Sequence, residues 1–226
     1  MTIDNKKLLI FDFDGTLIDS VPDLADAANI MLSQLGKPTY PIDTIKEWVG
    51  NGARMLVERA LSGSITIDPN LSEEEVAAAE RLFFEAYAAH DTSKTAAYPD
   101  VDLGLKQLSD AGFTLALVTN KPIRFVPDIL ASLGWTSHFA MVLGGDSLSV
   151  KKPDPTPLLH VCETLEFDPK QAFMIGDSIN DIQAGKRANI DTIGLSYGYN
   201  YGKDIRDSQP DYAFDNFQAL LDLLLK

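Results

Sequence analysis

Cysteine is nearly absent from this sequence, because Cys162 is the only one among 226 residues. A single cysteine cannot form an internal disulfide framework, and so low a content is typical of proteins in a reducing compartment. Residues 1–7 contain no apolar signal-peptide segment, and no hydrophobic run reaches membrane-spanning length. We therefore expect a cytoplasmic protein without a membrane-spanning segment.

Positive charge is also scarce, because 19 Lys and Arg residues face 33 Asp and Glu residues, for a formal net charge of -14. This excess argues against binding to nucleic acid and to anionic membrane surfaces. It does not exclude a small anionic substrate, because a local cation or lysine outweighs a distant, diffuse field. The 45% content of hydrophobic residues is enough for one sizeable core, or for a core and a smaller domain.

The most informative stretch is residues 8–17, in which an apolar run leads into Asp12 and Asp14. A short apolar run of this kind is typical of a buried strand in a parallel sheet. The carboxyl ends of such strands form a ligand crevice, and strand alternation puts both carboxylates on the same side of the backbone. Because adjacent carboxylates repel each other, one must be protonated or both must bind a cation.

Residues 20–90 show helical spacing of their apolar side chains. The pattern predicts helices over about 20–35, 42–49 and 53–61, and a longer helix whose apolar stripe runs from Val76 to Tyr87. Capping boxes are expected at Ser20 with Asp23 and at Ser72 with Glu75.

From residue 98 onward, predicted strands alternate with predicted helices, which indicates a parallel sheet wrapped by helices. The strands are 114–118, 139–143, 172–175 and 192–195, with 212–214 as a candidate edge strand. The helices are 103–111, 122–133, 154–165, 179–188 and 216–225, and Pro127 either kinks the second of these or starts its main part. The expected fold class is therefore α/β: a Rossmann-like parallel sheet core with helices on both faces, plus a small all-helical domain inserted after the first strand.

Polar residues stand at the ends of the predicted strands. They are Asp12 and Asp14, Thr119 to Lys121, Lys151 and Lys152, and Asp177 with Asp181. Because the carboxyl ends of parallel strands share one edge, these groups should converge on one crevice. Carboxylates suit Mg²⁺, a hard ion that prefers oxygen ligands, whereas lysine and hydroxyl groups suit phosphoryl oxygens. The set predicts a divalent-cation site that also handles a phosphate.

Each of these residues alone has a simpler explanation. Thr119 fits a strand-end threonine, Asn120 fits a helix cap, and Asp181 fits the acidic position of a capping box. Either Lys151 or Lys152 fits a solvated loop charge. The functional interpretation therefore depends on four independent strand ends with compatible chemistry, and not on any single residue.

Four motifs resemble those of the haloacid dehalogenase-like hydrolases in order and spacing; they lie at residues 12–16, 119–120, 152–153 and 176–181. The resemblance covers the whole chain. The helical segment resembles the small cap of the subgroup related to phosphoglycolate phosphatase and β-phosphoglucomutase. Two further stretches, 48–54 and 197–202, are similar to bacterial phosphoglycolate phosphatases, although each also fits a plain turn or surface loop.

The resemblance implies that Asp12 attacks phosphorus and forms an aspartyl-phosphate. Asp14 would protonate the leaving alkoxide and then deprotonate the water that hydrolyses the intermediate. Asp12, the backbone carbonyl of Asp14, and Asp177 would hold Mg²⁺, which shields the phosphate so that an anionic nucleophile can approach it.

The resemblance also implies a set of groups that receive the phosphoryl oxygens: Thr119, the Asn120 backbone amide and Lys152. Lys152 is preferred to Lys151 because the family's lysine directly precedes proline. Asp181 would fix Lys152 or a metal-bound water.

The same resemblance divides the chain into a catalytic α/β core, residues 1–19 and 93–226, and a helical cap, residues 20–92. The cap is expected to set specificity through Gly52 and Arg54, which follow the turn at residues 50–52. Arg54 either pairs with the carboxylate of a small acid or is a solvated helix arginine. Cap closure would exclude water, with hinges near 19–21 and 92–98.

The expected function is Mg²⁺-dependent hydrolysis of a small anionic phosphate ester, 2-phosphoglycolate, to glycolate and phosphate, by a monomer or homodimer. A phosphomutase like β-phosphoglucomutase, or a sugar-phosphate phosphatase, is the alternative on the same core. A catalytically idle regulatory protein is disfavoured because no chemical position is missing. A dehalogenase is disfavoured because it needs neither Asp14 nor Asp177.

Overall fold

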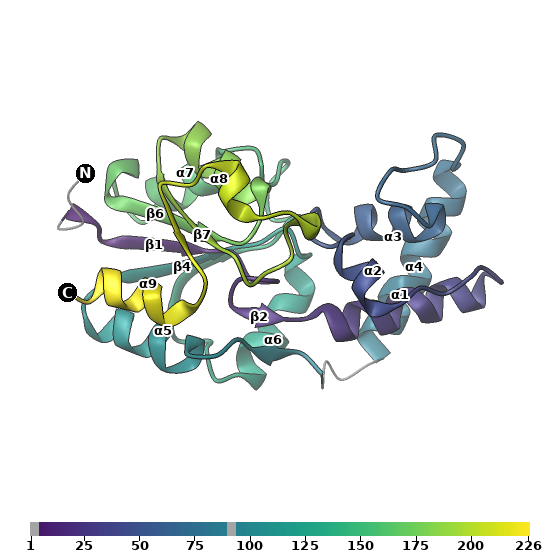
Figure 1. Ribbon diagram of the computed structural model, residues 1–226, viewed down its shortest axis with the longest axis horizontal. Coiled ribbons are helices and arrows are strands. Elements are labelled where there is room, and N and C mark those ends of the chain that lie inside the picture. Colours follow the sequence, from purple (N-terminus) through teal and green to yellow (C-terminus); the bar gives the residue numbers. More distant parts are fainter. Residues whose placement is uncertain (1–4, 90–93) are drawn as a thin grey trace.

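The computed structural model describes residues 5–89 and 94–226. Within these ranges, six parallel strands form one sheet in the order β5-β4-β1-β6-β7-β8, with helices on both sides (Figure 1). The strands are β1 (Leu8–Phe11), β4 (Thr114–Val118), β5 (Phe139–Leu143), β6 (Ala172–Gly176), β7 (Asp191–Leu195) and β8 (Tyr212–Phe214). The predicted fold class is confirmed, and β8 lies at the sheet edge as predicted.

Strand β1 lies between β4 and β6, and its side chains alternate between two cores. Leu9 and Phe11 pack with α5 (Val101–Asp110), α6 (Val126–Ser132) and α9 (Phe217–Leu224) on one face of the sheet. Leu8 and Ile10 pack with α7 (Thr156–Thr164) and α8 (Ile179–Ala188) on the other face. Because both faces of β1 are covered, the strand needs the unbroken apolar run from which it was predicted.

In the described chain, four helices lie between β1 and α5 and stand beside the carboxyl ends of the sheet strands (Figure 1). They are α1 (Val21–Gln34), α2 (Ile42–Lys46), α3 (Ala53–Ser62) and α4 (Glu73–Ala89). Their apolar faces form a cluster of their own around Leu24, Leu56 and Phe83. The capping box before α4 is confirmed, because Ser72 Oγ accepts from the Glu75 N–H and Glu75 accepts from the Ser72 N–H. The predicted end of this helical region, His90, lies outside the described residues.

The predicted capping box at Ser20 and Asp23 is wrong. The Ser20 hydroxyl donates a hydrogen bond to Asp14, and Asp23 accepts one from Thr95 Oγ1 at 2.5 Å. Neither side chain caps α1. Both side chains bond residues outside α1, and such partners compete successfully with a local cap.

A short ladder that the sequence did not predict joins the helical segment to the sheet. Strands β2 (Ile18–Asp19) and β3 (Ala96–Ala97) pair antiparallel where the chain leaves the sheet region and where it returns. The Tyr98 N–H extends this pairing by donating to the Leu17 carbonyl at 3.0 Å. The ladder lies at the two predicted hinges, although residues 92 and 93 are outside the described ranges.

The predicted helix at 122–133 consists of two parts. A 3-10 turn, η2 (Ile123–Phe125), precedes α6, and Pro127 lies in the first turn of α6. Pro127 therefore starts the main part of this helix, where its missing N–H is not needed. Across the described ranges, no helix is both long and apolar enough to cross a membrane.

Candidate active site

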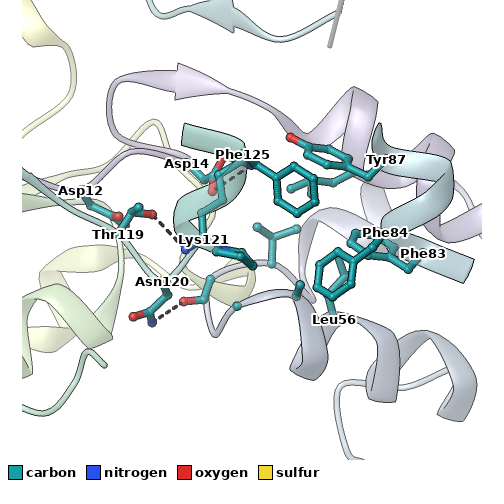
Figure 2. Close-up of a pocket in the computed structure, with 16 residues that line it drawn as sticks. Asp12, Asp14, Leu56, Phe83, Phe84, Tyr87, Thr119, Asn120, Lys121 and Phe125 are labelled. Carbon is teal, nitrogen blue, oxygen red and sulfur yellow. Dashed lines mark hydrogen bonds and ion pairs between the residues drawn. The ribbon is translucent and has the colours of Figure 1, made fainter. Parts of the chain in front are cut away.

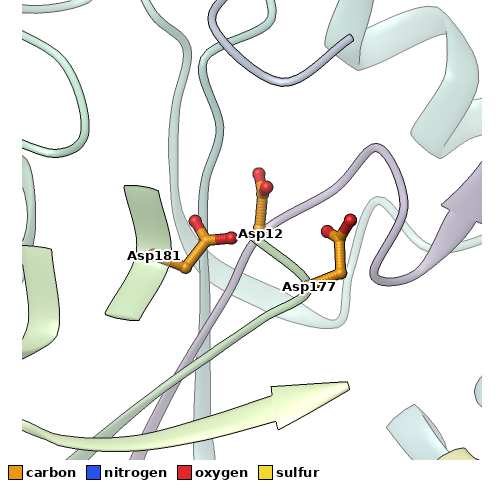
Figure 3. Close-up of side chains that lie close together, drawn as sticks. All are labelled: Asp12, Asp177 and Asp181. Carbon is orange, nitrogen blue, oxygen red and sulfur yellow. The ribbon is translucent and has the colours of Figure 1, made fainter. Parts of the chain in front are cut away.

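Three aspartates meet at the carboxyl edge of the sheet. Asp12 follows β1, Asp177 follows β6, and Asp181 lies in the first turn of α8 (Figure 3). One oxygen from each carboxylate lies within 4.8 Å of the others. Asp177 and Asp181 are buried and Asp12 is nearly so. Parallel topology brings residues 12 and 177 together, as the sequence predicted for strand ends.

Electrostatics make this cluster suited to a cation. Burial is the main reason that the pKa values of Asp12 and Asp177 are raised, and the charge of Asp181 raises both further. The Thr16 hydroxyl donates to Asp177 Oδ1 at 2.8 Å and the Tyr199 N–H donates to Oδ2 at 2.7 Å, so this carboxylate has a fixed orientation. Carboxylates so close and so buried can be ionised together only beside a positive charge. The oxygen-only donor set fits a hard divalent ion such as Mg²⁺.

Lys152 lies beside the cluster with its side chain 1% exposed. Its Nζ is 2.9 Å from Asp12 Oδ1 and 2.7 Å from Asp181 Oδ1. Burial alone would lower the pKa of Lys152, but the two carboxylates outweigh burial and raise it, so the ammonium is charged. The neighbouring Lys151 instead donates to the Asn51 carbonyl at 2.8 Å. The structure thus separates the two lysines that the strand-end pattern left as alternatives.

Asp181 uses its two oxygens for different partners. Oδ1 pairs with Lys152, while Oδ2 accepts from the Ser178 N–H at 3.0 Å and from the Ser178 hydroxyl at 2.7 Å. Both contacts considered for Asp181, the capping box and the pair with Lys152, are therefore present. Gly176 allows this arrangement, because a Cβ there would lie 2.3 Å from Asp181 Cγ.

Asp14 has different partners from Asp12. Its carboxylate accepts a hydrogen bond from the Ser20 hydroxyl. It also pairs with Lys121 Nζ at 3.0 Å (Figure 2). The Lys121 side chain is only 3% exposed. Two carboxylates two residues apart thus lie in separate environments, which suits them to separate chemical tasks.

Thr119 and Asn120 follow β4 at the same sheet edge. The side-chain amide of Asn120 donates to the Lys152 carbonyl at 3.0 Å and to the Gly50 carbonyl at 3.1 Å, so it connects the sheet edge with the helical segment. It does not cap a helix. Gly52 packs against the same residue: its φ is +88°, and a Cβ would lie 2.9 Å from the Asn120 carbonyl oxygen. Glycine is therefore the residue that this close approach requires.

Further polar contacts hold the loop before α3 against the sheet edge. Asn180 Nδ2 donates to the Gly50 carbonyl at 3.2 Å and to the Tyr201 hydroxyl at 2.6 Å. Arg59, on α3, donates to Asn51 Oδ1 at 3.0 Å and so fixes the loop to its own helix. The contacts of Asn120, Lys151 and Asn180 hold the loop over the strand ends.

A cavity of about 40 Å³ lies between the sheet edge and the helices (Figure 2). Its polar wall comes from the strand ends and includes Asp12, Asp14, Thr119, Asn120 and Lys121. Its apolar wall comes mainly from the helices and includes Leu24, Leu56, Phe83 and Phe84, with the Tyr87 ring beside them.

Arg54 lies outside this cavity, in an adjoining hollow that Gly52 and Lys151 also line. Its side chain is 41% exposed, and its guanidinium pairs with Glu58 at 3.1 Å and with Glu73 at 2.6 Å. Its part in binding a substrate carboxylate stays a prediction.

Three residues in or beside the cavity were given no chemical part from the sequence. Tyr87 fits the apolar stripe of α4, and Ser20 fits a helix cap. Lys121 had one signal, since it directly follows Thr119 and Asn120.

Comparison with known proteins gives consistent results. The model of the family described as haloacid dehalogenase-like hydrolase matches residues 9–195. A phosphoglycolate phosphatase from Psychrobacter arcticus is 67% identical over 223 residues, which cover 98% of this chain and 97% of that protein. One from Colwellia psychrerythraea is 49% identical over 221 residues, 98% of each chain. The solved structure of a protein from Haemophilus somnus, described as a predicted phosphoglycolate phosphatase, superposes with a TM-score of 0.90 at 38% identity and covers 99% of both chains.

Proposed function

The chain belongs to the haloacid dehalogenase-like hydrolases, and on this premise we propose that it is a Mg²⁺-dependent phosphatase that converts 2-phosphoglycolate to glycolate and phosphate through an aspartyl-phosphate. The observation that carries the proposal is the convergence of Asp12, Lys152 and Asp177 beside a small cavity. Two relatives that match almost the full chain are named phosphoglycolate phosphatase, which supports the choice of substrate.

Asp12, the backbone carbonyl of Asp14, and Asp177 would hold the Mg²⁺ ion. Asp181 is close enough to hold a metal-bound water while it pairs with Lys152. The ion, when bound, neutralises charge so that an anionic nucleophile can approach an anionic phosphate. The buried, mutually repelling carboxylates support this assignment.

The reaction takes place in two halves. In the first, an Asp12 oxygen forms a bond to phosphorus, the bond from phosphorus to the leaving oxygen breaks, and Asp14 gives that oxygen its proton. In the second, Asp14 removes a proton from water, the water oxygen bonds to phosphorus, and the bond to Asp12 breaks. Ser20 and Lys121 keep the Asp14 carboxylate in place for both transfers.

The phosphoryl oxygens are received by the Thr119 hydroxyl, the Asn120 N–H and the Lys152 ammonium. These donors are fixed before substrate arrives, because Lys152 is held by Asp12 and Asp181 and because the Asn120 side chain is held by two backbone carbonyls. Donors in fixed positions stabilise the charge that spreads over these oxygens without further reorganisation.

We assign residues 1–19 and 93–226 to the catalytic core and residues 20–92 to a cap, with hinges near 19–21 and 92–98. The β2–β3 ladder supports this division, because both connections pass through it. The contacts of Gly50 with Asn120 and Asn180 support closure of the cap over the site.

A substrate panel tests the proposal. Release of free phosphate is measured from 2-phosphoglycolate, a hexose phosphate, a nucleoside monophosphate and an aryl phosphate, each with Mg²⁺ or with EDTA. We expect kcat/KM for 2-phosphoglycolate to exceed the others by about 100-fold or more, and EDTA to abolish turnover. Preference for another ester by orders of magnitude rejects the substrate. Transfer of phosphate between sugar positions without release of free phosphate identifies a phosphomutase.

A further inference from the structure

The cavity contains a cation that receives no phosphoryl oxygen in the proposed reaction. Among the described residues that line it, Lys121 carries the only positive charge. Its Nζ lies 3.0 Å from Asp14 Oδ1 and 4.9 Å from the centroid of the Tyr87 ring. Burial alone would lower the pKa of Lys121, but Asp14 outweighs burial and raises it. The cavity therefore presents a charged ammonium beside its apolar wall.

A second polar group in the cavity lacks an acceptor. Tyr87 is 2% exposed, and its hydroxyl has no hydrogen-bond acceptor within the described chain. Burial raises the pKa of this phenol even though Lys121 opposes the shift, so the hydroxyl is neutral and can donate. In Figure 2 the hydroxyl is directed toward the side of the cavity where Asp14 lies. Buried donors normally have acceptors, so this one indicates an acceptor that belongs to a ligand.

The position of Asp14 limits where the rest of the substrate can lie. In the proposed reaction Asp14 protonates the leaving oxygen, which must then lie within hydrogen-bond distance of its carboxylate. In 2-phosphoglycolate a single methylene separates this oxygen from the substrate's carboxylate. Lys121 is already in contact with Asp14, so it can reach that carboxylate without a large movement.

We propose that Lys121 and Tyr87 form a subsite for the substrate carboxylate, with Lys121 as countercharge and Tyr87 as a neutral hydrogen-bond donor. This inference rests on the proposed function and names the groups that select its substrate: phosphate monoesters of small 2-hydroxy acids. The remaining cavity wall is apolar around Leu56 and Phe83, so an anion placed there needs both donors.

Arg54 is the competing candidate for the same carboxylate. It lies outside the cavity, its side chain is 41% exposed, and Glu58 and Glu73 already pair with its guanidinium. Water and these glutamates screen its charge, whereas Lys121 acts in a site from which water is largely excluded. The two assignments give opposite results for one pair of substrates.

The test compares 2-phosphoglycolate with ethyl phosphate, which is similar in size but lacks the carboxylate. We measure kcat and KM for both substrates in the wild type, Lys121→Met, Lys121→Arg, Tyr87→Phe and Arg54→Met. The quantity of interest is kcat/KM for 2-phosphoglycolate divided by kcat/KM for ethyl phosphate. Lys121→Met should lower this ratio about 10- to 100-fold and Tyr87→Phe about 3- to 10-fold, while Lys121→Arg retains most of it. Arg54→Met should leave the ratio unchanged.

Binding without turnover gives an independent readout, because Lys121→Met also removes a contact of Asp14. In an Asp12→Asn background, calorimetry should show tighter binding of 2-phosphoglycolate than of ethyl phosphate. Adding Lys121→Met should remove that difference. If Lys121→Met does not fold, the same difference in binding is measured for Tyr87→Phe in the Asp12→Asn background, where it should be reduced.

The subsite is overturned if Lys121→Met and Tyr87→Phe lower kcat/KM equally for both substrates. It is also overturned if Arg54→Met is the only variant that lowers the ratio of the two kcat/KM values. Failure of the proposed function is a different result. In that case the wild type itself does not prefer 2-phosphoglycolate to ethyl phosphate.

Discussion

Replacing Lys152 by methionine should strongly destabilise the metal-free protein at basic pH. The Lys152 ammonium is buried and lies 2.9 Å from Asp12 and 2.7 Å from Asp181. Methionine retains much of the apolar stem but leaves two buried carboxylates without their countercharge. Breaking a buried ion pair in this way costs about 3–5 kcal/mol. For a protein of this length, such a loss lowers Tm by roughly 6–20 °C.

The size of the loss should depend on pH and on Mg²⁺. Burial, and then the charge of Asp181, raise the pKa of Asp12 from 3.8 to about 8 in the wild type. A carboxyl whose pKa is raised in the folded state favours folding at low pH, and this advantage disappears as pH rises through the raised value. The difference in Tm between Lys152→Met and the wild type should therefore be small at pH 5 and should increase as pH rises through about 8. Mg²⁺ supplies another countercharge and should reduce the difference at pH 8.

Thermal unfolding followed by circular dichroism measures this effect, at pH 5 and pH 8, with EDTA or with Mg²⁺. Lys151→Met is the matched control, because it removes the adjacent lysine, whose Nζ donates to the Asn51 carbonyl and not to a carboxylate. We expect it to cost about 1 kcal/mol. Equal Tm values for the two variants, or a loss in Lys152→Met that ignores both pH and Mg²⁺, would refute the reasoning.

Three further predictions follow from the same site. Asp12→Asn should abolish phosphate release and leave the circular dichroism spectrum unchanged; turnover at the wild-type rate rejects Asp12 as nucleophile. In EDTA the wild type should lose stability as pH rises from about 4 to about 8, because burial raises the pKa of Asp12 to about 8 and that of Asp177 to about 7. Saturating Mg²⁺ should flatten this dependence of Tm on pH. A Tm that does not change with pH in EDTA contradicts the prediction. Gly52→Ala should lower kcat/KM about 10- to 100-fold because the new Cβ meets the Asn120 carbonyl. Gly36→Ala is the control: Gly36 also has a positive φ, +66°, but open space around it, so the change should cost only about 1 kcal/mol of stability. Equal kcat/KM values for the two variants would exclude the steric explanation.

Much of the fold could be predicted because local sequence and tertiary environment agree. The run at residues 8–11 predicts β1 since a strand covered on both faces needs apolar side chains at every position. Helix α8 has the predicted bounds, 179–188, because Ser178 and Asp181 form a capping box at its start. The same spacing failed at Ser20, since nothing local shows that its hydroxyl bonds Asp14 instead of its own helix.

The polar edge of the site could be predicted because parallel topology places strand ends together whatever lies between them in the chain. Lys121 and Tyr87 could not be assigned in this way. The Tyr87 hydroxyl reaches the cavity only because α4 packs over the strand ends, and that packing is set by contacts between helices far apart in sequence. Cellular location and oligomeric state stay predictions, since no contact within one chain bears on them.

The β2–β3 ladder has a consequence for how such chains diversify. Because the two connections are paired with each other, helices α1 to α4 begin and end at neighbouring points, and the cost of closing the intervening chain grows only slowly with its length. The insertion can thus be lengthened, shortened or exchanged without shifting any strand of the large sheet. A relative can keep its phosphate chemistry while acquiring a new set of helices, and with them a different choice of leaving group.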